Sequence, residues 1–274
     1  MLVLALKLTL APGLVAATTV AVRRWGPRVA GWLGGLPVVV GPILFALALE
    51  QGDAFAAEAA QGSLLGLLSL NAFVLAYAWA ARRVGWAQAL LAGWAAFAAA
   101  TLVLDPLRVS DEAALAVVVA AFFLTEAALP RGRGEEVAPH TPRFDLLLRT
   151  VCTAALVLGL TALAGVLGPR LSGMLAAFPV LASVLAAFTQ AQAGAVAAAD
   201  FLRGLVRGLI SFALFCFVVA VLLPSAGMAV AFGAATFAAL GAHAVGHGVS
   251  SAFGWPARQR SRSARLAASN SGGR

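Results

Sequence analysis

Charged residues are scarce in this sequence, and catalytic signatures are missing from it. Only 11% of its residues are Asp, Glu, Lys or Arg, whereas 62% are hydrophobic. An ordinary globular domain is roughly half apolar and a quarter charged, so a fold of this composition could not cover its surface with polar groups. The composition excludes a typical water-soluble protein and predicts an all-α, polytopic transmembrane helical bundle.

Cysteine is also nearly absent, and the histidines form no known motif. Cys152 and Cys216 stand 64 residues apart within apolar stretches, a spacing that indicates neither a disulfide framework nor a metal site. No GxSxG, Walker loop, GxGxxG or acidic cluster occurs. His243 and His247 share a helical face, but no acid accompanies them as in the HExxH zinc motif. We therefore predict no enzyme, no cofactor and no metal; a membrane enzyme using these histidines is the third alternative.

What the sequence does contain is a series of apolar runs. A helix needs about 20 residues, at 1.5 Å each, to cross a hydrocarbon core about 30 Å thick. The first run lacks a small-residue cleavage site, so we predict a retained helix rather than a signal peptide. About nine spans are predicted, near residues 8–22, 29–49, 61–81, 84–104, 113–129, 146–167, 171–191, 204–223 and 228–250.

The basic residues lie in alternate loops between these spans. With the N-terminus outside and the C-terminus in the cytoplasm, sixteen of the nineteen Lys and Arg residues are cytoplasmic, as the positive-inside rule requires. Only Lys7, Arg108 and Arg170 then lie outside. Without the fifth span, the basic C-terminal tail would lie outside as well. The net charge of +8 thus predicts membrane orientation and no nucleic-acid partner.

An internal repeat appears when the sequence is compared with itself at an offset of 142 residues. No gap is needed, and the register extends over four predicted helices in each half. Glycine and proline dominate the matches, which pair residues 26, 27, 28, 31, 37 and 52 with residues 168, 169, 170, 173, 179 and 194. Because four helices return the chain to its starting side, one intervening helix would invert the second unit.

The predicted organisation is therefore 4+1+4. Residues 1–106 form the first membrane repeat, 107–145 a linker helix and cytoplasmic loop, 146–252 the second repeat, and 253–274 a basic tail. Inverted repeats of this kind recur in secondary transporters, whose sites lie between the repeats near the bilayer midplane.

Gly-Pro-Arg opens the second and the seventh predicted helix, with Arg28 in one and Arg170 in the other. Proline suits a first helical turn, but an arginine there faces the positive end of the helix dipole and typically loses about 0.3–1 kcal/mol. Two arginines at equivalent, unfavourable positions suggest an anion contact or a gate. The alternative is that each extends to the lipid headgroups.

Pro37 and Pro179 follow those arginines by nine residues, which is about 13 Å along a helix and near mid-bilayer. Each proline removes the hydrogen bond to the carbonyl four residues back, Leu33 or Leu175. Interrupted helices at corresponding places in two halves are the best sequence indication of a transport site. A simple packing kink is the alternative.

A few polar residues complete the candidate site. Glu50 aligns with Gln192 at the ends of the same two helices and is either a proton-binding or an interfacial carboxylate. Asn71, in the third helix, must face protein or a cavity. We expect the GxxxG pairs Gly62–Gly66 and Gly204–Gly208 to serve helix packing, and Asp200 with Arg203 to form a structural ion pair.

The second repeat resembles a known family. Residues 171–245, with SGMLAAFPVLASVLAAFTQAQAG followed by LRGLVRGLISFALFCFVVAVLLP, resemble the GlpM-like family of small four-helix bacterial inner-membrane proteins. The likeness rests on Phe178 and Pro179, then Gly194, then Arg203. It implies a fused, inverted duplicate in a bacterial inner membrane and does not imply a substrate.

The leading functional hypothesis is a secondary transporter or permease for a small polar or anionic solute. Its midplane site would comprise residues from both repeats, namely Arg28, Pro37, Glu50, Asn71, Arg170, Pro179 and Gln192. The expected partners are the lipid bilayer, the solute and a coupling ion. A non-transporting membrane scaffold or assembly factor is the second hypothesis.

Overall fold

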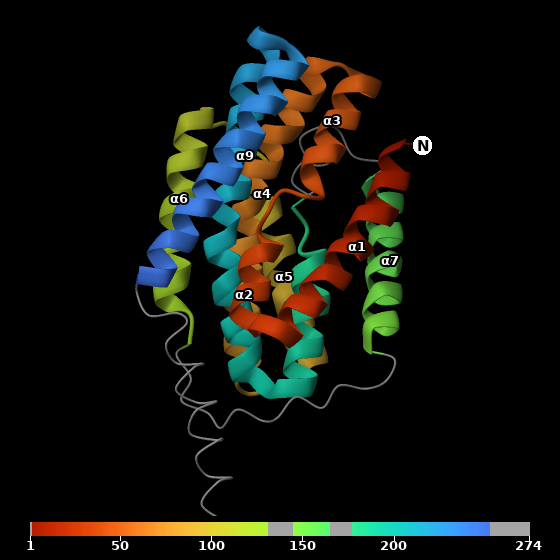
Figure 1. Ribbon diagram of the computed structural model, residues 1–274, viewed down its shortest axis with the longest axis vertical. Helices are drawn as coiled ribbons and strands as arrows, with labels where there is room; N and C mark the ends of the chain where they lie inside the picture. The colour runs from red at the N-terminus through yellow and green to blue at the C-terminus, as the bar shows by residue number, and fades with distance from the viewer. Residues whose placement is uncertain (1, 131–144, 165–176, 253–274) are drawn as a thin grey trace, which may run out of the picture.

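The computed structural model describes residues 2–130, 145–164 and 177–252, and these residues fold into helices without a strand (Figure 1). The elements are α1 (Leu2–Trp25), α2 (Pro27–Gly34), α3 (Val40–Gln51), α4 (Asp53–Ala80), α5 (Trp86–Leu104), α6 (Asp111–Ala128), α7 (Asp145–Ala164) and α9 (Val180–Ala252). The all-helical fold class is confirmed. Arg170 and the 253–274 tail lie outside the described residues.

α9 is a run of three helices rather than one rod. Its 73 residues would extend about 110 Å as a straight helix, far beyond a bilayer core of about 30 Å. Two glycines inside it, Gly194 (φ 82°) and Gly227 (φ 75°), adopt the left-handed backbone that only glycine enters without strain. They divide α9 into a first segment (180–193), a second segment (195–226) and a third segment (228–252), which fold back beside one another (Figure 1).

Gly52 makes the corresponding turn in the first half, between α3 and α4. Its backbone angles (φ 91°, ψ 166°) are close to those of Gly194 (φ 82°, ψ 175°), 142 residues later. Gly85 and Gly227 share the same offset but differ, because Gly85 has a φ of −68°. The two halves thus make one of these two turns in the same way.

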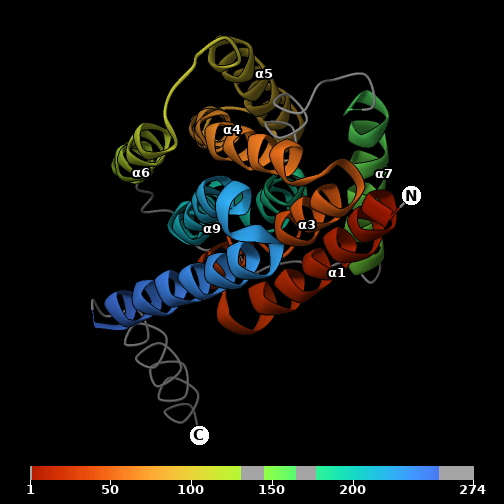
Figure 2. The same ribbon diagram turned by 90° about the horizontal axis from the view of Figure 1, so that it is seen from above.

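Three helical stretches of the described residues are long and apolar enough to cross a membrane: α4 (Asp53–Ala80), α5 (Trp86–Leu104), and the part Val180–Gly246 of α9, which its two glycine turns divide. Large apolar side chains cover the outside of the bundle, including Phe237 (80% exposed) and Leu102 (74% exposed). Water would not stabilise such a surface, and these are the helices of a membrane protein. Seen along the long axis, α4 and the first two segments of α9 lie centrally, with α5 and α6 on one side and α1 and α7 on the other (Figure 2).

Glycines bring α2 against the second segment of α9. A Cβ placed on Gly204 would lie 1.9 Å from the Arg28 carbonyl oxygen, and one on Gly208 would lie 2.2 Å from the Trp32 oxygen. Gly31 and Gly35 make equally close approaches from α2. The predicted packing role of Gly204 and Gly208 is confirmed, since no other residue allows two helix backbones to approach so closely.

Candidate functional site

The first feature of the candidate site is the interruption between α2 and α3. α2 ends at Gly34 and α3 begins at Val40, so the predicted break at Pro37 is present. The Leu36 amide donates to the Leu33 carbonyl (3.2 Å), which is the acceptor that Pro37 leaves without its helical partner. The Gly41 amide donates to the Pro37 carbonyl (2.9 Å), which starts α3. The chain therefore satisfies the freed Leu33 carbonyl locally.

The second proline stands at a similar place. Pro179 directly precedes α9, and its carbonyl accepts from the Ser183 amide (2.7 Å) in the first helical turn. Leu175, whose carbonyl we predicted to lose its helical hydrogen bond to Pro179, lies outside the described residues. A Cβ on Gly34 would lie 2.8 Å from Cδ2 of Leu181. The start of α9 and the end of α2 are thus in contact, and the two helix ends next to Pro37 and Pro179 lie side by side.

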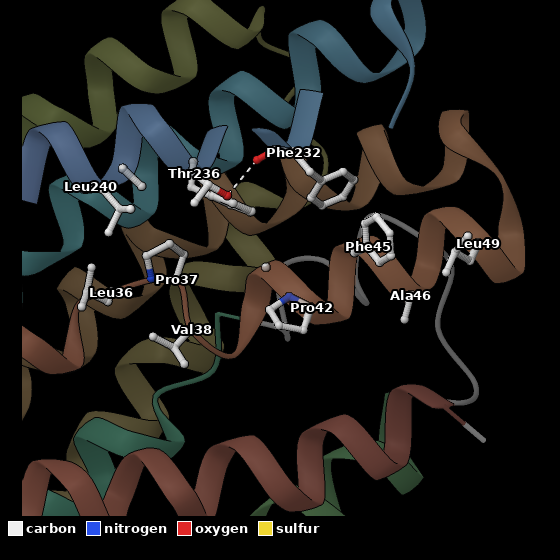
Figure 3. Close-up of a pocket in the computed structure, with 13 residues that line it drawn as sticks. Leu36, Pro37, Val38, Pro42, Phe45, Ala46, Leu49, Phe232, Thr236 and Leu240 are labelled. Carbon is white, nitrogen blue, oxygen red and sulfur yellow. Dashed lines mark hydrogen bonds between the residues drawn. The ribbon is translucent and has the colours of Figure 1, made fainter. Parts of the chain in front are cut away.

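A pocket opens beside Pro37, between the α2–α3 break and the third segment of α9 (Figure 3). Its volume is about 600 Å³, within the range of ligand cavities. Apolar groups line it, and the hydroxyl of Thr236, a polar group at the wall, donates to the Phe232 carbonyl (2.8 Å). The pocket extends from Leu36 to Leu49. It can accommodate an apolar group but offers few hydrogen-bonding partners.

Ion pairs cluster where α2 begins. Arg28 pairs with Asp200, and Arg203 donates to the same carboxylate oxygen (2.9 Å). The predicted Asp200–Arg203 pair is therefore present, but it also holds Arg28. Arg203 further donates to the carbonyls of Pro130 (3.0 Å) and Leu129 (3.4 Å), which are free because α6 ends at Ala128.

Arg207 forms a second ion pair nearby, with Glu126 of α6. Its Nε donates to Oε1 of Glu126 at 2.8 Å. The five charged groups of this cluster, Arg28, Asp200, Arg203, Arg207 and Glu126, include three cations and two anions. The sequence missed Asp200 as the partner of Arg28 and Glu126 as the partner of Arg207, because each pair joins residues far apart in the chain.

A buried histidine of the third segment of α9, His243, packs against the end of α2. The His243 ring stacks on Trp32, with centroids 3.7 Å apart and planes 18° apart. Its Nδ1 lies 3.3 Å from the Ser211 hydroxyl, which also donates to the Gly208 carbonyl (2.7 Å) and lies 3.5 Å from the Gly35 carbonyl oxygen. The serine thus connects the third segment of α9 to the backbone at the α2–α3 break.

The equivalent positions in the first half form the same kind of bond. Thr101 donates to the hydroxyl of Ser69 (2.9 Å), and these residues precede His243 and Ser211 by 142 positions. The sequence contained this signal, because the repeat register aligns the two pairs. Only the second pair carries a titratable group. The described residues hold no cluster of three or more His, Cys, Asp or Glu that could bind a metal ion, and the side chain of His247 lies outside them.

Three further candidates lie in α3, α4 and α9. Asn71 is buried in α4, where Nδ2 donates to the Leu67 carbonyl (2.9 Å) and Oδ1 accepts no hydrogen bond from the described residues. Gln192 accepts from the buried Arg149 of α7 (3.0 Å). Glu50 is exposed at the end of α3. The structure therefore brings the surroundings of Pro37 and Pro179 together, whereas the grouping of Glu50, Asn71 and Gln192 with them stays a prediction.

Gln190, which the sequence did not assign to the site, joins the first segment of α9 to α4. Its Oε1 accepts from the hydroxyl of Tyr77 (2.8 Å), and its Nε2 donates to the carbonyls of Val84 (3.0 Å) and Ala81 (3.3 Å). These carbonyls lie just beyond the end of α4. Gln190 therefore caps that helix from a distant part of the chain.

Comparisons with protein-family models, curated proteins and solved structures give no match to this chain.

Proposed function

We propose that this protein is a secondary transporter or permease of the bacterial inner membrane, with nine spans arranged as inverted 4+1+4 repeats. Its solute would be small and polar or anionic, and the site would lie between the repeats near the two helix interruptions. The resemblance to the GlpM-like family belongs to this proposal as a prediction of location and ancestry. The observation that carries the proposal is the contact between the Pro37 and Pro179 regions.

Interrupted helices are useful in transport because their ends expose backbone groups that can bind a solute and can move at low cost. The contact between Gly34 and Leu181 brings two such ends together from separate halves of the chain. The similar turns at Gly52 and Gly194 and the matching bonds of Ser69 and Ser211 support the repeat. They do so independently of the sequence alignment, because they are features of conformation.

Contacts between distant segments are consistent with the proposed alternation of the spans. Gln61 donates to Asp111 (2.8 Å), which joins two segments that the charge pattern assigns to the outside. Arg203 donates to Pro130 (3.0 Å), which joins two segments assigned to the cytoplasm. Segments assigned to the same side thus meet each other, as alternating spans require.

Arg28 has a specific part in this proposal. Its partner Asp200 neutralises the charge in the present conformation, and the two side chains are 41% and 35% exposed. An exposed pair of this kind typically contributes less than about 1 kcal/mol, so a solute anion could replace the Asp200 carboxylate. Arg28 and Asp200 would then form a cytoplasmic gate. Arg170 would act at the opposite end of the pathway.

The test is solute uptake into proteoliposomes by the purified full chain, with labelled acetate, lactate and inorganic phosphate as probes. We expect uptake of at least one probe above protein-free liposomes, and we expect Arg28→Ala to reduce it at least tenfold. Glu126→Gln is the matched control, because it removes an ion pair at the same end without touching α2. No uptake of any probe, or equal loss in both variants, would contradict the proposal.

A membrane scaffold or assembly factor is the second candidate. The close glycine contact between α2 and α9 favours it, because two backbones held so tightly do not easily move apart. In that case the prolines shape the bundle and the ion pairs hold its end together. Cross-linking Gly34→Cys to Leu181→Cys would distinguish the two, since it should stop a transporter and leave a scaffold unaffected.

A further inference from the structure

The surroundings of the two helix interruptions differ in one informative way. At the offset of 142 residues, Leu36 and Pro37 correspond to Phe178 and Pro179, and Phe215 corresponds to Phe73. Two wall positions of the pocket beside Pro37, Thr236 and Ala239, correspond to Trp94 and Phe97. At these two positions the first half carries large aromatic residues and the second half carries small ones.

The aromatic pair, from the first half, packs beside the interruption of the second half. The ring centroids of Trp94 and Phe97 lie 6.1 Å and 5.2 Å from the ring of Phe178, next to Pro179. Trp94 also donates to the hydroxyl of Ser183 (2.9 Å). Beside Pro37, the side chains of Thr236 and Ala239 are too short to do the same. A cavity of about 600 Å³ thus lies beside the two positions whose counterparts, 142 residues earlier, carry aromatic side chains.

The length of the pocket matches one half of a bilayer. It follows α3 from the break at Pro37 to Leu49, close to the end of that helix at Gln51. The nine helical steps from Val40 to Leu49 correspond to about 14 Å, and half of a hydrocarbon core is about 15 Å. The pocket begins where the helix breaks and ends where α3 would leave the lipid.

Its mouth faces the outside of the bundle. Leu49 and Leu240, at its two ends, are 56% and 55% exposed, and Phe45 between them is 42% exposed (Figure 3). In a membrane such side chains meet acyl chains. A polar occupant would find few partners here, because the Thr236 hydroxyl is already bonded to Phe232 and burying an unpaired polar group is costly.

We propose that this pocket is a lipid site that holds one acyl chain of a bilayer phospholipid, from the leaflet at the Leu49 end. The chain lies along α3 with its terminal methyl group near Pro37. The acyl chain beside Pro37 has the role that Trp94 and Phe97 have beside Pro179. The interrupted helix is therefore supported by an exchangeable lipid rather than by side chains. The inference does not depend on transport and stands whether or not the protein moves a solute.

The test is photolabelling of the full chain in nanodiscs, with a phospholipid that carries a diazirine near the end of one acyl chain. Lipid that only surrounds the protein labels in proportion to its mole fraction, whereas a bound chain gives saturable labelling. We expect saturable adducts on residues 36–49 and 232–240, mapped by mass spectrometry. Labelling of these residues that rises linearly throughout would overturn the proposal.

Filling the pocket provides the second arm. The double variant Thr236→Trp/Ala239→Phe copies the aromatic pair of the other half, and we expect it to reduce saturable labelling at least tenfold. Phe237→Trp is the matched control, because it adds bulk to the same helix at a side chain that is 80% exposed and outside the pocket. Unchanged labelling in the double variant would refute the site.

Native mass spectrometry of the wild-type protein keeps the proposal testable if the double variant does not fold. After detergent washing, we expect one phospholipid to remain per chain, and Ala239→Phe alone to remove it. Complete loss of lipid from the wild type, or retention of a free fatty acid instead of a phospholipid, would contradict the assignment.

Discussion

The close packing of α2 on α9 makes a quantitative prediction for Gly204→Ala. The new Cβ would lie 1.9 Å from the Arg28 carbonyl oxygen, whereas ordinary contacts begin at 3.4 Å. The obstacle is backbone, so the helices must separate by about 1.5 Å or the helix must bend. Overpacking of this kind typically costs about 1–3 kcal/mol, and it also weakens the neighbouring contacts of Gly31 and Gly35.

Helix propensity alone would give the opposite result. Alanine is about 1 kcal/mol more favourable than glycine in a helix interior. Gly233→Ala, in the third segment of α9, isolates this effect because nothing lies within 4 Å of the added Cβ. We therefore expect Gly233→Ala to stabilise the protein and Gly204→Ala to destabilise it, with a difference of about 2–4 kcal/mol in the free energy of unfolding.

The assay is unfolding of the purified protein by SDS in mixed micelles, followed by circular dichroism. Both variants change one glycine to alanine in α9, so their detergent binding should be alike. If Gly204→Ala were as stable as Gly233→Ala, the two backbones would not be in contact, and the position of α2 on α9 would be wrong.

Three further predictions concern topology and the buried polar groups. Alkaline phosphatase and green fluorescent protein fused after Leu104 should report an external position. The same fusions after Arg133 and at the C-terminus should report a cytoplasmic position. If Leu104 and Arg133 reported the same side, the inverted repeat would be ruled out. Gln190→Leu should lower the free energy of unfolding by about 2–4 kcal/mol, because it strips partners from Tyr77 and two carbonyls, and SDS titration showing less than 0.5 kcal/mol would disprove that network. His243→Thr copies Thr101 of the first half and should retain the hydrogen bond to Ser211. It should therefore lower the free energy of unfolding less than His243→Leu in the same titration. The reverse order would show that the Thr101–Ser69 and His243–Ser211 pairs are not equivalent.

Several local features were predictable because they depend on residues close together in the chain. Proline removes its own amide from the helix ladder, so the interruption at Pro37 follows from chemistry alone. The Asp200–Arg203 pair follows from helical spacing. The spacing of Gly204 and Gly208 predicted a close contact between two helices, but it did not identify α2 as the partner helix. The candidate residues Glu50, Asn71 and Gln192 were grouped by their positions in the predicted helices, and spacing along the chain cannot say whether their side chains meet.

Composition and local chemistry were enough to predict an all-helical chain with the apolar helices expected of a membrane protein and a break at Pro37, whereas the 142-residue repeat stays a prediction. Hydrophobicity, proline and glycine act locally, so their effects can be worked out residue by residue. Three contacts could not be foreseen before the chain folds: Arg28 meets Asp200, Gln190 caps a distant helix, and a pocket opens beside Pro37 whereas Trp94 and Phe97 pack on Phe178 beside Pro179. Those outcomes depend on which side chains from distant segments occupy the same volume, and packing settles that question only when the whole bundle is assembled.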